Sequence, residues 1–330
     1  MKAAVYCGPR DIQVKDVATP GIKANEILVK VHACGICGSD LHAYRIGMFE
    51  ESLGRPLDEG LIMGHEFSGE VVEAGSEVEK FQVGDRVTGG GMGGFAEFIS
   101  VAVDAKRPHL LPDTVSFEEG AMMEPLATSV HAVGLAKPTD GETVVILGVG
   151  IIGLGCIQVI RATAGGRIIA VDASERRLEM AQQLGADEVV NLTEVDPVEA
   201  VIEYTGGERP VEKFGVRGGN ADVVIDSAGA RASLNQGLTM LKQQNGRLVP
   251  VALFEDQPDL DVNQVVRKQV ALQGSWAWTA DDYLRGIKLV ESGKIDREPL
   301  ISHVFSLDEA PEAFATQARP DAAIKTLLKP

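Results

Sequence analysis

Residue types that bind zinc occur together in the first 130 residues of the chain. Cys37 offers a thiolate, His65 an imidazole, and Glu66 and Glu124 a carboxylate each. A catalytic zinc site uses three such protein ligands and leaves a fourth position for water or substrate. The residue types fit that chemistry. Because they lie far apart in sequence, spacing alone does not distinguish them from a core cysteine, a hydrogen-bonded histidine and solvated acids.

A glycine-rich segment in the middle of the chain suits a different chemistry. It reads Gly148-Val-Gly150-Ile-Ile152-Gly153, follows an apolar run, and opens a stretch with helical period. Glycines at this turn let the backbone approach a pyrophosphate, whose charge lies at the amino end of the helix. Asp172 ends the next apolar run, 19 residues after Gly153, where a carboxylate accepts ribose hydroxyls. The pattern predicts dinucleotide binding.

The residues around Asp172 indicate which cofactor binds. Its carboxylate would repel a 2′-phosphate, so NAD is favoured over NADP. Arg176 and Arg177 leave an alternative open, because a nearby guanidinium can accommodate that phosphate or can simply be part of a solvated helix face. Arg177 is included among the predicted cofactor residues, together with the three glycines, Ile152 and Asp172.

Length and charge exclude several classes of protein. The chain has 330 residues, enough for about two domains by the usual prior of ~150 residues each. Lys and Arg total 31 against 48 Asp and Glu, and the net charge of −17 opposes nucleic acid or an anionic membrane as partner. With 45% apolar and 24% charged residues, the composition is that of an ordinary globular protein.

Targeting signals are not evident in the sequence. The first residues have no apolar core of signal-peptide length before Arg10 and Asp11, so a cytoplasmic protein is expected. The longest apolar stretch, 144–157, is shorter than the ~18 residues of a membrane helix and contains four glycines. Four cysteines are too few for a disulfide framework in a chain of this length.

The chain has two kinds of sequence pattern, which predict two kinds of domain. From Lys2 to about Pro112, short β-like runs, the last of them 95–101, alternate with Gly, Asp and Pro, which indicates a β-rich module. From Thr143 to about Trp276, apolar runs alternate with helical segments, the pattern of βαβ units around a buried parallel sheet. A further helical pattern, 282–291, and a strand, 323–328, follow. The predicted fold class is α/β, with a doubly wound sheet as one domain.

Two segments carry a resemblance to a known family. Gly64-His65-Glu66-Phe-Ser-Gly69, followed by Gly75 and Val78, resembles the zinc signature of the medium-chain alcohol dehydrogenases, and Cys34-Gly-Ile-Cys37 begins a segment similar to their first ligand segment. The sequence Glu124-Pro-Leu resembles the polyol branch, which includes sorbitol, threonine and butanediol dehydrogenases. The likeness extends over essentially the whole chain.

This resemblance assigns roles to individual residues. It implies that Cys37, His65 and Glu124 are the zinc ligands, that Glu66 is a neighbouring carboxylate able to enter or support the ligand shell, and that Cys34 is not a ligand. Asp40 resembles the carboxylate that orients the histidine ligand, which fixes its tautomer. Ser39 and His42 match the family's proton relay.

One departure from the family limits the metal content. Most zinc members insert a lobe with four closely spaced cysteines, which hold a structural zinc, after the segment matching residues 84–87. This chain has no cysteine between Cys37 and Cys156. We therefore expect a single, catalytic zinc per chain.

The resemblance also implies an architecture. Residues 1–130 and 276–330 would form a discontinuous GroES-like catalytic domain, with a Rossmann cofactor domain at 131–275 and the active site between them. Family members pair subunits through the sixth strand of the cofactor sheet, which here is 271–275. An open edge strand favours association, so a homodimer or homotetramer is expected.

The implied reaction is hydride transfer between NAD(H) and a secondary alcohol or its ketone. The polyol branch suggests a diol, polyol, cyclic or amino alcohol, that is, a small-molecule substrate. Sorbitol dehydrogenases typically carry an arginine at the end of the sixth strand, whereas this chain has Trp276-Ala-Trp278, which favours a short diol or a cyclic alcohol. A zinc-free quinone or enoyl reductase of the same fold, and a non-catalytic dinucleotide sensor, are the alternatives.

Overall fold

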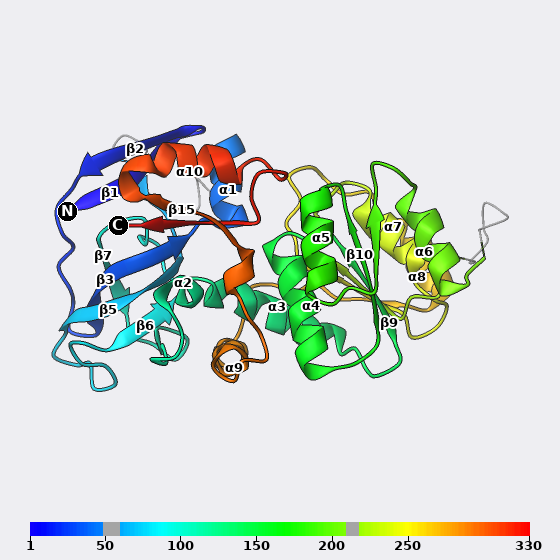
Figure 1. The fold of residues 1–330 in the computed structure, drawn as a ribbon, viewed down its shortest axis with the longest axis horizontal. Helices are drawn as coiled ribbons and strands as arrows, with labels where there is room; N and C mark the ends of the chain where they lie inside the picture. The colour runs from blue at the N-terminus through cyan, green and yellow to red at the C-terminus, as the bar shows by residue number, and fades with distance from the viewer. Residues whose placement is uncertain (49–59, 209–217) are drawn as a thin grey trace. The chain divides into compact units, whose positions relative to one another are not determined.

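The structure of the chain is a computed structural model with mixed α/β secondary structure. It describes residues 1–48, 60–208 and 218–330. Figure 1 shows the helices and strands of these residues in chain order. No helix in these three ranges is both long and apolar enough to cross a bilayer.

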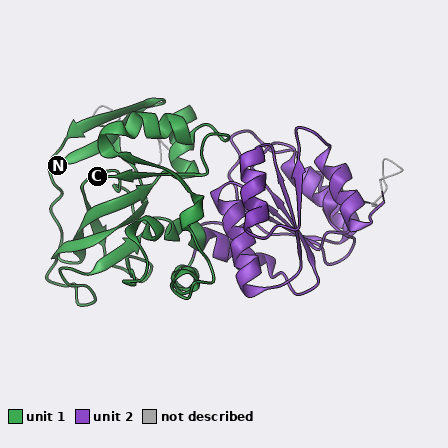
Figure 2. Cartoon of the chain, viewed as in Figure 1, with its two compact units in different colours: residues 1–127, 279–330 green, residues 128–278 purple. Residues whose placement is uncertain are grey.

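The chain divides into two compact units, which Figure 2 shows in different colours. Unit 1 combines residues 1–127 with residues 279–330, and unit 2 is the intervening stretch, residues 128–278. The discontinuous unit is therefore closed by the C-terminal segment of the chain. The sequence analysis places the two boundaries after residues 130 and 275.

Unit 2 is built on a six-stranded sheet whose order is β11-β10-β9-β12-β13-β14. Its strands are β9 (Thr143–Leu147), β10 (Arg167–Asp172), β11 (Glu188–Asn191), β12 (Val223–Asp226), β13 (Arg247–Pro250) and β14 (Ala271–Leu272). All neighbouring strands pair in parallel. Because the strand order runs outward from β9 in both directions, this is the predicted doubly wound sheet. The fold class is confirmed.

Helices cover both faces of this sheet. They are α4 (Ile151–Thr163), α5 (Glu175–Gln183), α6 (Pro197–Thr205), α7 (Ser233–Met240) and α8 (Val262–Lys268). Figure 1 shows α4 and α5 on one face and α6, α7 and α8 on the other. Val144, Val145 and Ile146 of β9 are therefore all fully buried, although their side chains alternate between the faces. This burial on both sides explains the continuous apolar runs in the sequence.

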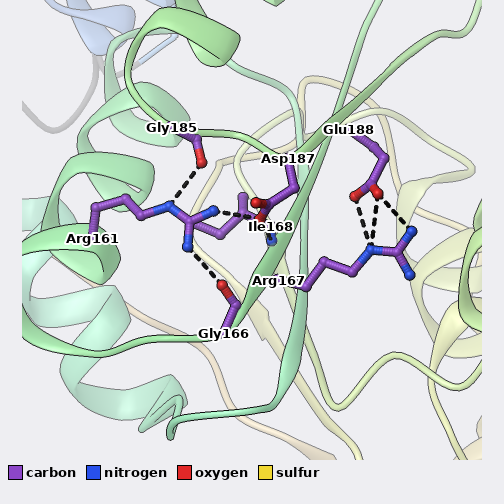
Figure 3. A network of polar contacts seen from close by, with 7 residues as sticks. All are labelled: Arg161, Gly166, Arg167, Ile168, Gly185, Asp187 and Glu188. Atoms are coloured by element: carbon purple, nitrogen blue, oxygen red, sulfur yellow. Dashed lines mark hydrogen bonds and ion pairs between the residues drawn. The ribbon is translucent and has the colours of Figure 1, made fainter.

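A polar network joins the loops at the amino ends of β10 and β11 (Figure 3). The guanidinium of Arg161, at the end of α4, donates to the carbonyl oxygens of Gly185 (2.7 Å) and Gly166 (2.6 Å) and pairs with Asp187. Two loops, the one before β10 and the one before β11, are thus held by one side chain. The network lies at the edge of the sheet opposite to the glycine-rich loop, so it stabilises the fold and leaves the carboxyl edge for binding.

Unit 1 is β-rich and contains two sheets. One has three strands in the order β2-β1-β4, and the other has the order β15-β16-β3-β5-β6-β8, with β7 also paired to β3. The strands are β1 (Lys2–Gly8), β2 (Asp11–Asp16), β3 (Glu26–Gly35), β4 (Leu61–Ile62), β5 (Glu66–Ala74), β6 (Arg86–Gly89), β7 (Phe98–Ala102), β8 (His109–Leu110), β15 (Ile301–Ser306) and β16 (Lys325–Lys329). Its core includes Phe67, Phe95 and Phe314, all buried.

Unit 1 also contains the helices α1 (Gly38–Ile46), α2 (Phe117–Gly120), α9 (Ala280–Glu291) and α10 (Ala310–Gln317). Helix α3 (Met123–Ala136) begins in unit 1, and its residues from Thr128 onward belong to unit 2. The functional residues of unit 1 lie where β3 ends and β5 begins, because the two strands are antiparallel and Gly35 pairs with Glu66. Strand β16 adds to the same place by pairing Leu327 with Gly35.

The sequence analysis misplaced some elements. It predicted a strand over 95–101, but β7 begins at Phe98, since residues 95–97 cross to the N-terminal strand, where Ala96 forms an isolated bridge with Ala3. It did not predict helix α8 or strand β15. The side chains of α8 are largely exposed and give little apolar period, and β15 lies at the edge of its sheet, so neither shows a strong burial pattern.

Candidate metal and cofactor sites

Cys37, His65 and Glu66 form one cluster in unit 1. A ligand atom of each, the Cys37 Sγ, a His65 ring nitrogen and a Glu66 carboxylate oxygen, lies within 4.8 Å of the other two. Cys37 is the residue before helix α1, and Glu66 is the first residue of β5. A thiolate, an imidazole and a carboxylate at this separation fit a zinc ion. Among the described residues, this is the group whose spacing suits a metal.

Gly64 shapes the turn that presents His65. Its φ of 87° is in the left-handed region, which residues with a Cβ disfavour. A Cβ at this position would also lie 2.7 Å from the ring of Phe95. The glycine of the zinc signature is therefore needed for the backbone that leads into the histidine.

Asp40 holds the cluster from within helix α1. Its Oδ2 accepts a hydrogen bond from the backbone N–H of Cys37 (2.9 Å), and its Oδ1 lies 3.8 Å from the Nδ1 of His65. Burial raises the pKa of Asp40, while the charge of His65 acts to lower it. One carboxyl group thus touches the backbone of the cysteine and faces the ring of the histidine.

Negatively charged groups surround His65. Burial acts against the charged imidazole, but Cys37, Asp40 and Glu124 outweigh it and raise the pKa of His65 well above its usual range. Glu124, in the first turn of α3, lies outside the three-residue cluster. Its charge helps to raise the pKa of His65. A site that favours a positive charge so strongly favours a bound cation for the same reason.

Glu66 is paired with a residue that the sequence analysis did not consider. Its carboxylate forms an ion pair with Lys325 of β16, and both side chains are fully buried. The signal in the sequence is a lysine inside the apolar run that ends the chain, since a buried lysine requires a partner. Ser39 and His42, the predicted proton relay, lie three residues apart in α1, and both are half-buried.

The glycine-rich loop lies between β9 and α4 in unit 2. Gly148 has a φ of 79°, and a Cβ there would lie 2.7 Å from the Cα of Ala228 in the loop after β12. A Cβ on Gly153 would overlap the carbonyl oxygen of Gly148. Gly150 precedes the first residue of α4, and Ile152 in its first turn is half-buried. The glycines bring strand, turn and helix close together, as a phosphate-binding loop requires.

Asp172 ties this loop to the end of β10. Its Oδ2 accepts a hydrogen bond from the N–H of Val149 (2.7 Å), and its Oδ1 accepts from the N–H groups of Ala173 (2.8 Å) and Ser174 (2.9 Å). The guanidinium of Arg177, on α5, lies 3.8 Å from the Cβ position of Gly150. The predicted cofactor residues are therefore brought together at the carboxyl edge of the sheet.

A second aspartate, missed by the sequence analysis, holds the neighbouring loop. Asp226 ends β12 and is fully buried; its Oδ1 accepts from the N–H groups of Ala228 (3.0 Å) and Gly229 (3.3 Å). The hydroxyl of Ser227 donates to the carbonyl oxygen of Gly148 (2.5 Å). The available signal was an acid at the end of a buried strand, the same position as Asp172 one strand away.

Hydrogen counting indicates that Asp226 is a neutral acid. The Oγ of Ser233 lies 2.5 Å from Asp226 Oδ2 and 2.7 Å from the carbonyl oxygen of Ala230. A hydroxyl has one hydrogen, so two separate hydrogen bonds form here when the carboxyl group supplies a second one. Burial raises the pKa of Asp226, which favours this protonated form.

The fold and the two sites together define a class of protein. A doubly wound parallel sheet with a glycine-rich loop, in one chain with a β-rich unit that carries a Cys-His-Glu cluster, is the arrangement of a medium-chain dehydrogenase. Comparison with known families agrees. Residues 23–113 match the alcohol dehydrogenase GroES-like domain, and residues 152–292 match the zinc-binding dehydrogenases.

Individual relatives match over nearly the full chain. Sorbitol dehydrogenase of Bacillus subtilis is 31% identical over 95% of this chain and 92% of its own length. (R,R)-butanediol dehydrogenase of the same organism is 31% identical over 100% of both chains. The chain belongs to the zinc-dependent medium-chain alcohol dehydrogenases, in their polyol branch, and is an alcohol/polyol oxidoreductase. The family expectation is confirmed.

Solved structures agree with this assignment. The crystal structure of 2R,3R-butanediol dehydrogenase from Bacillus subtilis has a TM-score of 0.84 at 30% identity and covers 100% of this chain and 99% of its own. A zinc-binding dehydrogenase structure from Sinorhizobium meliloti 1021, bound to NADP, has a TM-score of 0.84 at 30% identity and covers the same shares. A zinc site and a nicotinamide cofactor are thus features of the group to which this chain is similar.

We predict that Asp226→Asn retains stability and that Asp226→Ala does not. The amide can replace a neutral carboxyl group at each contact, whereas alanine leaves buried groups unpaired at a cost of roughly 2–4 kcal/mol in the free energy of unfolding. Because the folded-state pKa is raised, the contribution of Asp226 is complete at low pH and is lost as the pH rises through the folded pKa.

Urea unfolding of the three proteins between pH 4 and pH 8 measures this effect. Relative to the asparagine variant, the wild type should lose stability with rising pH. If the asparagine variant is as unstable as the alanine variant, Asp226 is charged and the hydrogen count is wrong.

Proposed function

We propose that this chain is a zinc- and NAD-dependent dehydrogenase that interconverts a secondary alcohol and its ketone. The observation that carries the proposal is the cluster of Cys37, His65 and Glu66, because the alternatives, a zinc-free reductase and a dinucleotide sensor, do not need it. The glycine-rich loop with Asp172 supports the cofactor part of the proposal. The family supports the reaction type.

Two carboxylates compete for the third ligand position. The resemblance assigns Cys37, His65 and Glu124, whereas the 4.8 Å spacing supports Glu66 as the partner of Cys37 and His65. We propose that Cys37, His65 and Glu66 hold the metal and that Glu124 is a further acid of the site, whose charge acts on His65. The chemistry that zinc supplies when bound is Lewis-acid polarisation of a substrate oxygen.

The residues of helix α1 would position and move the proton. Asp40 orients the metal-binding pair, because it accepts from the backbone N–H of Cys37 and faces the Nδ1 of His65. Ser39 would accept the hydroxyl proton of the substrate while its own proton passes along the relay to His42, which would release a proton to solvent. The hydride chemistry belongs to the nicotinamide, which the protein has to hold in place.

NAD is the proposed cofactor because of the charge and hydrogen bonds of Asp172. A carboxylate has about four acceptor positions. Three are filled by the N–H groups of Val149, Ala173 and Ser174, so one remains for a ribose hydroxyl. The negative charge repels a 2′-phosphate at the same place. Arg177, which lies beside Gly150, is then a contact for the loop and its phosphates.

The substrate class follows from the polyol branch. A secondary alcohol with a second polar group is proposed: a diol, polyol, cyclic or amino alcohol. Sorbitol and (R,R)-butanediol dehydrogenases, both similar to this chain, support that range. Trp276 is 68% exposed and Trp278 is half-buried, so apolar surface takes the place of the arginine that the resemblance leads one to expect after the sixth strand.

A homo-oligomer is proposed from the edge of the cofactor sheet. Strand β14 lies at this edge, and its two residues are exposed. Apolar side chains of Val262, Val266 and Leu272 are exposed in the same region, at 57%, 69% and 37%. A second copy of the chain could pair with the strand edge and cover these side chains.

The oligomer proposal predicts a molar mass two or four times that of the chain. Light scattering after size exclusion measures it. Val266→Glu should lower the mass to that of one chain, because the charge would be buried on association. Lys294→Glu, on unit 1, is the control. A wild-type protein with the mass of a single chain at micromolar concentration would contradict the proposal.

The metal proposal predicts one zinc per chain. Cys37→Ala should lose the zinc and its turnover but bind NAD nearly as well as the wild type, since the glycine-rich loop belongs to unit 2. Elemental analysis, activity and NADH fluorescence titration give the three readouts. Cys34→Ala is the matched control, three residues earlier, and should keep its zinc. Two zincs per chain, or full activity in Cys37→Ala, would overturn the assignment.

A substrate panel tests the reaction and the cofactor together. It contains secondary alcohols, vicinal diols, threonine, sugar alcohols and primary alcohols. Each compound is tested with NAD and with NADP, and the reaction is measured by the absorbance of the reduced cofactor. We expect the highest kcat/KM for a short diol or a cyclic secondary alcohol with NAD. Preference for sorbitol or xylitol would contradict the role given to the tryptophans. Preference for NADP would show that Arg176 or Arg177 outweighs Asp172.

A further inference from the structure

The ion pair between Lys325 and Glu66 is buried more deeply than the others in the described residues. Both side chains are 0% exposed, whereas every other pair has a partner in contact with solvent. Surface pairs contribute little to stability and have no fixed geometry. A fully buried pair has to be held by its surroundings, and here one member belongs to the metal-binding cluster.

Lys325 contacts both ends of the cluster. Besides pairing with Glu66, its Nζ donates to the carbonyl oxygen of Ile36 (2.8 Å). Ile36 is the residue before Cys37, and its own N–H donates to the carbonyl oxygen of Thr326 (3.1 Å). Strand β16 therefore fixes the backbone that leads into the cysteine and the side chain of the glutamate at the same time.

Space around the pair is closed by Gly35. A Cβ on Gly35 would overlap Glu66 Oε2 and would lie 2.8 Å from the Cε of Lys325. The carboxylate is thus packed against backbone on one side and held by the ammonium group. A carboxylate oxygen of Glu66 also lies within 4.8 Å of the ligand atoms of Cys37 and His65.

We propose that Lys325 is a positioning residue that holds the Glu66 carboxylate, and the backbone before Cys37, at the separation that a metal ion requires. The inference rests on the proposed metal site. Without the ammonium group, the buried carboxylate loses its ion-pair partner and is no longer fixed against β3. Metal binding must then also order the ligand, which weakens it.

The test is the affinity of the metal-free, full-length protein for Co²⁺, measured by visible absorption in competition with a chelator. Lys325→Met removes the charge at nearly constant length, and Lys325→Gln also removes it but can still donate to Ile36. Both should bind Co²⁺ about tenfold to a hundredfold more weakly than the wild type. Lys325→Arg should recover most of the affinity.

The control lies on the same strand. Lys329 pairs with Glu118 at the surface, with 46% and 33% of the two side chains exposed, and Lys329→Met should bind Co²⁺ like the wild type. Circular dichroism confirms that each metal-free variant is folded. If Lys325→Met does not fold, the Co²⁺ affinity of Lys325→Gln alone tests the inference.

A double-mutant cycle separates positioning from a general effect on the fold. In a Glu66→Gln background, Lys325→Met should reduce the affinity by less than about threefold, because its partner is already absent. The inference is overturned if Lys325→Met and Lys325→Gln both bind Co²⁺ within threefold of the wild type, or if the loss is equal in both backgrounds. A wild-type protein that binds no Co²⁺ would instead refute the metal site itself.

Discussion

At Gly35, three strands of unit 1 come so close together that no side chain fits between them. Gly35 pairs with Glu66 of β5 on one side and with Leu327 of β16 on the other. The space that a Cβ would fill is occupied by the Glu66 carboxylate and the Lys325 side chain. Cys37, which follows β3, the Glu66 carboxylate and the Lys325 ammonium group thus come from segments far apart in sequence, and the strand register decides whether they meet. A shift of one residue would turn Glu66 to the other face of the sheet.

In unit 2, carboxyl groups at the ends of two strands hold the neighbouring loops in place. Asp172 ends β10 and Asp226 ends β12, on either side of β9, and each accepts hydrogen bonds from backbone N–H groups of a loop. The loop after β12 in turn holds the glycine-rich loop through Ser227. Loops that are already fixed lose less conformational freedom when a ligand binds. The acids therefore shape the carboxyl edge of the sheet by holding its loops.

The sequence was sufficient for the fold class, because buried parallel strands give continuous apolar runs and the glycine spacing marks the turn after β9. It also identified the types of residue in the metal cluster. The resemblance assigned Glu124 as the third ligand and Glu66 as its neighbour, but which carboxylate lies with Cys37 and His65 depends on how β3 and β5 pair and on where α3 begins. Nor did the sequence analysis find Lys325 or Asp226, whose importance lies in contacts that have no sequence period.

Two buried lysines, one in each unit, have different roles because their hydrogen-bond and ion-pair partners differ. Lys268 is 2% exposed and donates to the carbonyl oxygens of Leu238, Thr239 and Leu241 at the end of α7, and burial lowers its pKa to about 8. Its partners are neutral and structural, so losing its proton weakens a helix end and affects no ligand. Lys325 donates to a single carbonyl and shares its charge with Glu66. The same ammonium group therefore caps a helix in one unit, while in the other it holds a buried carboxylate in place.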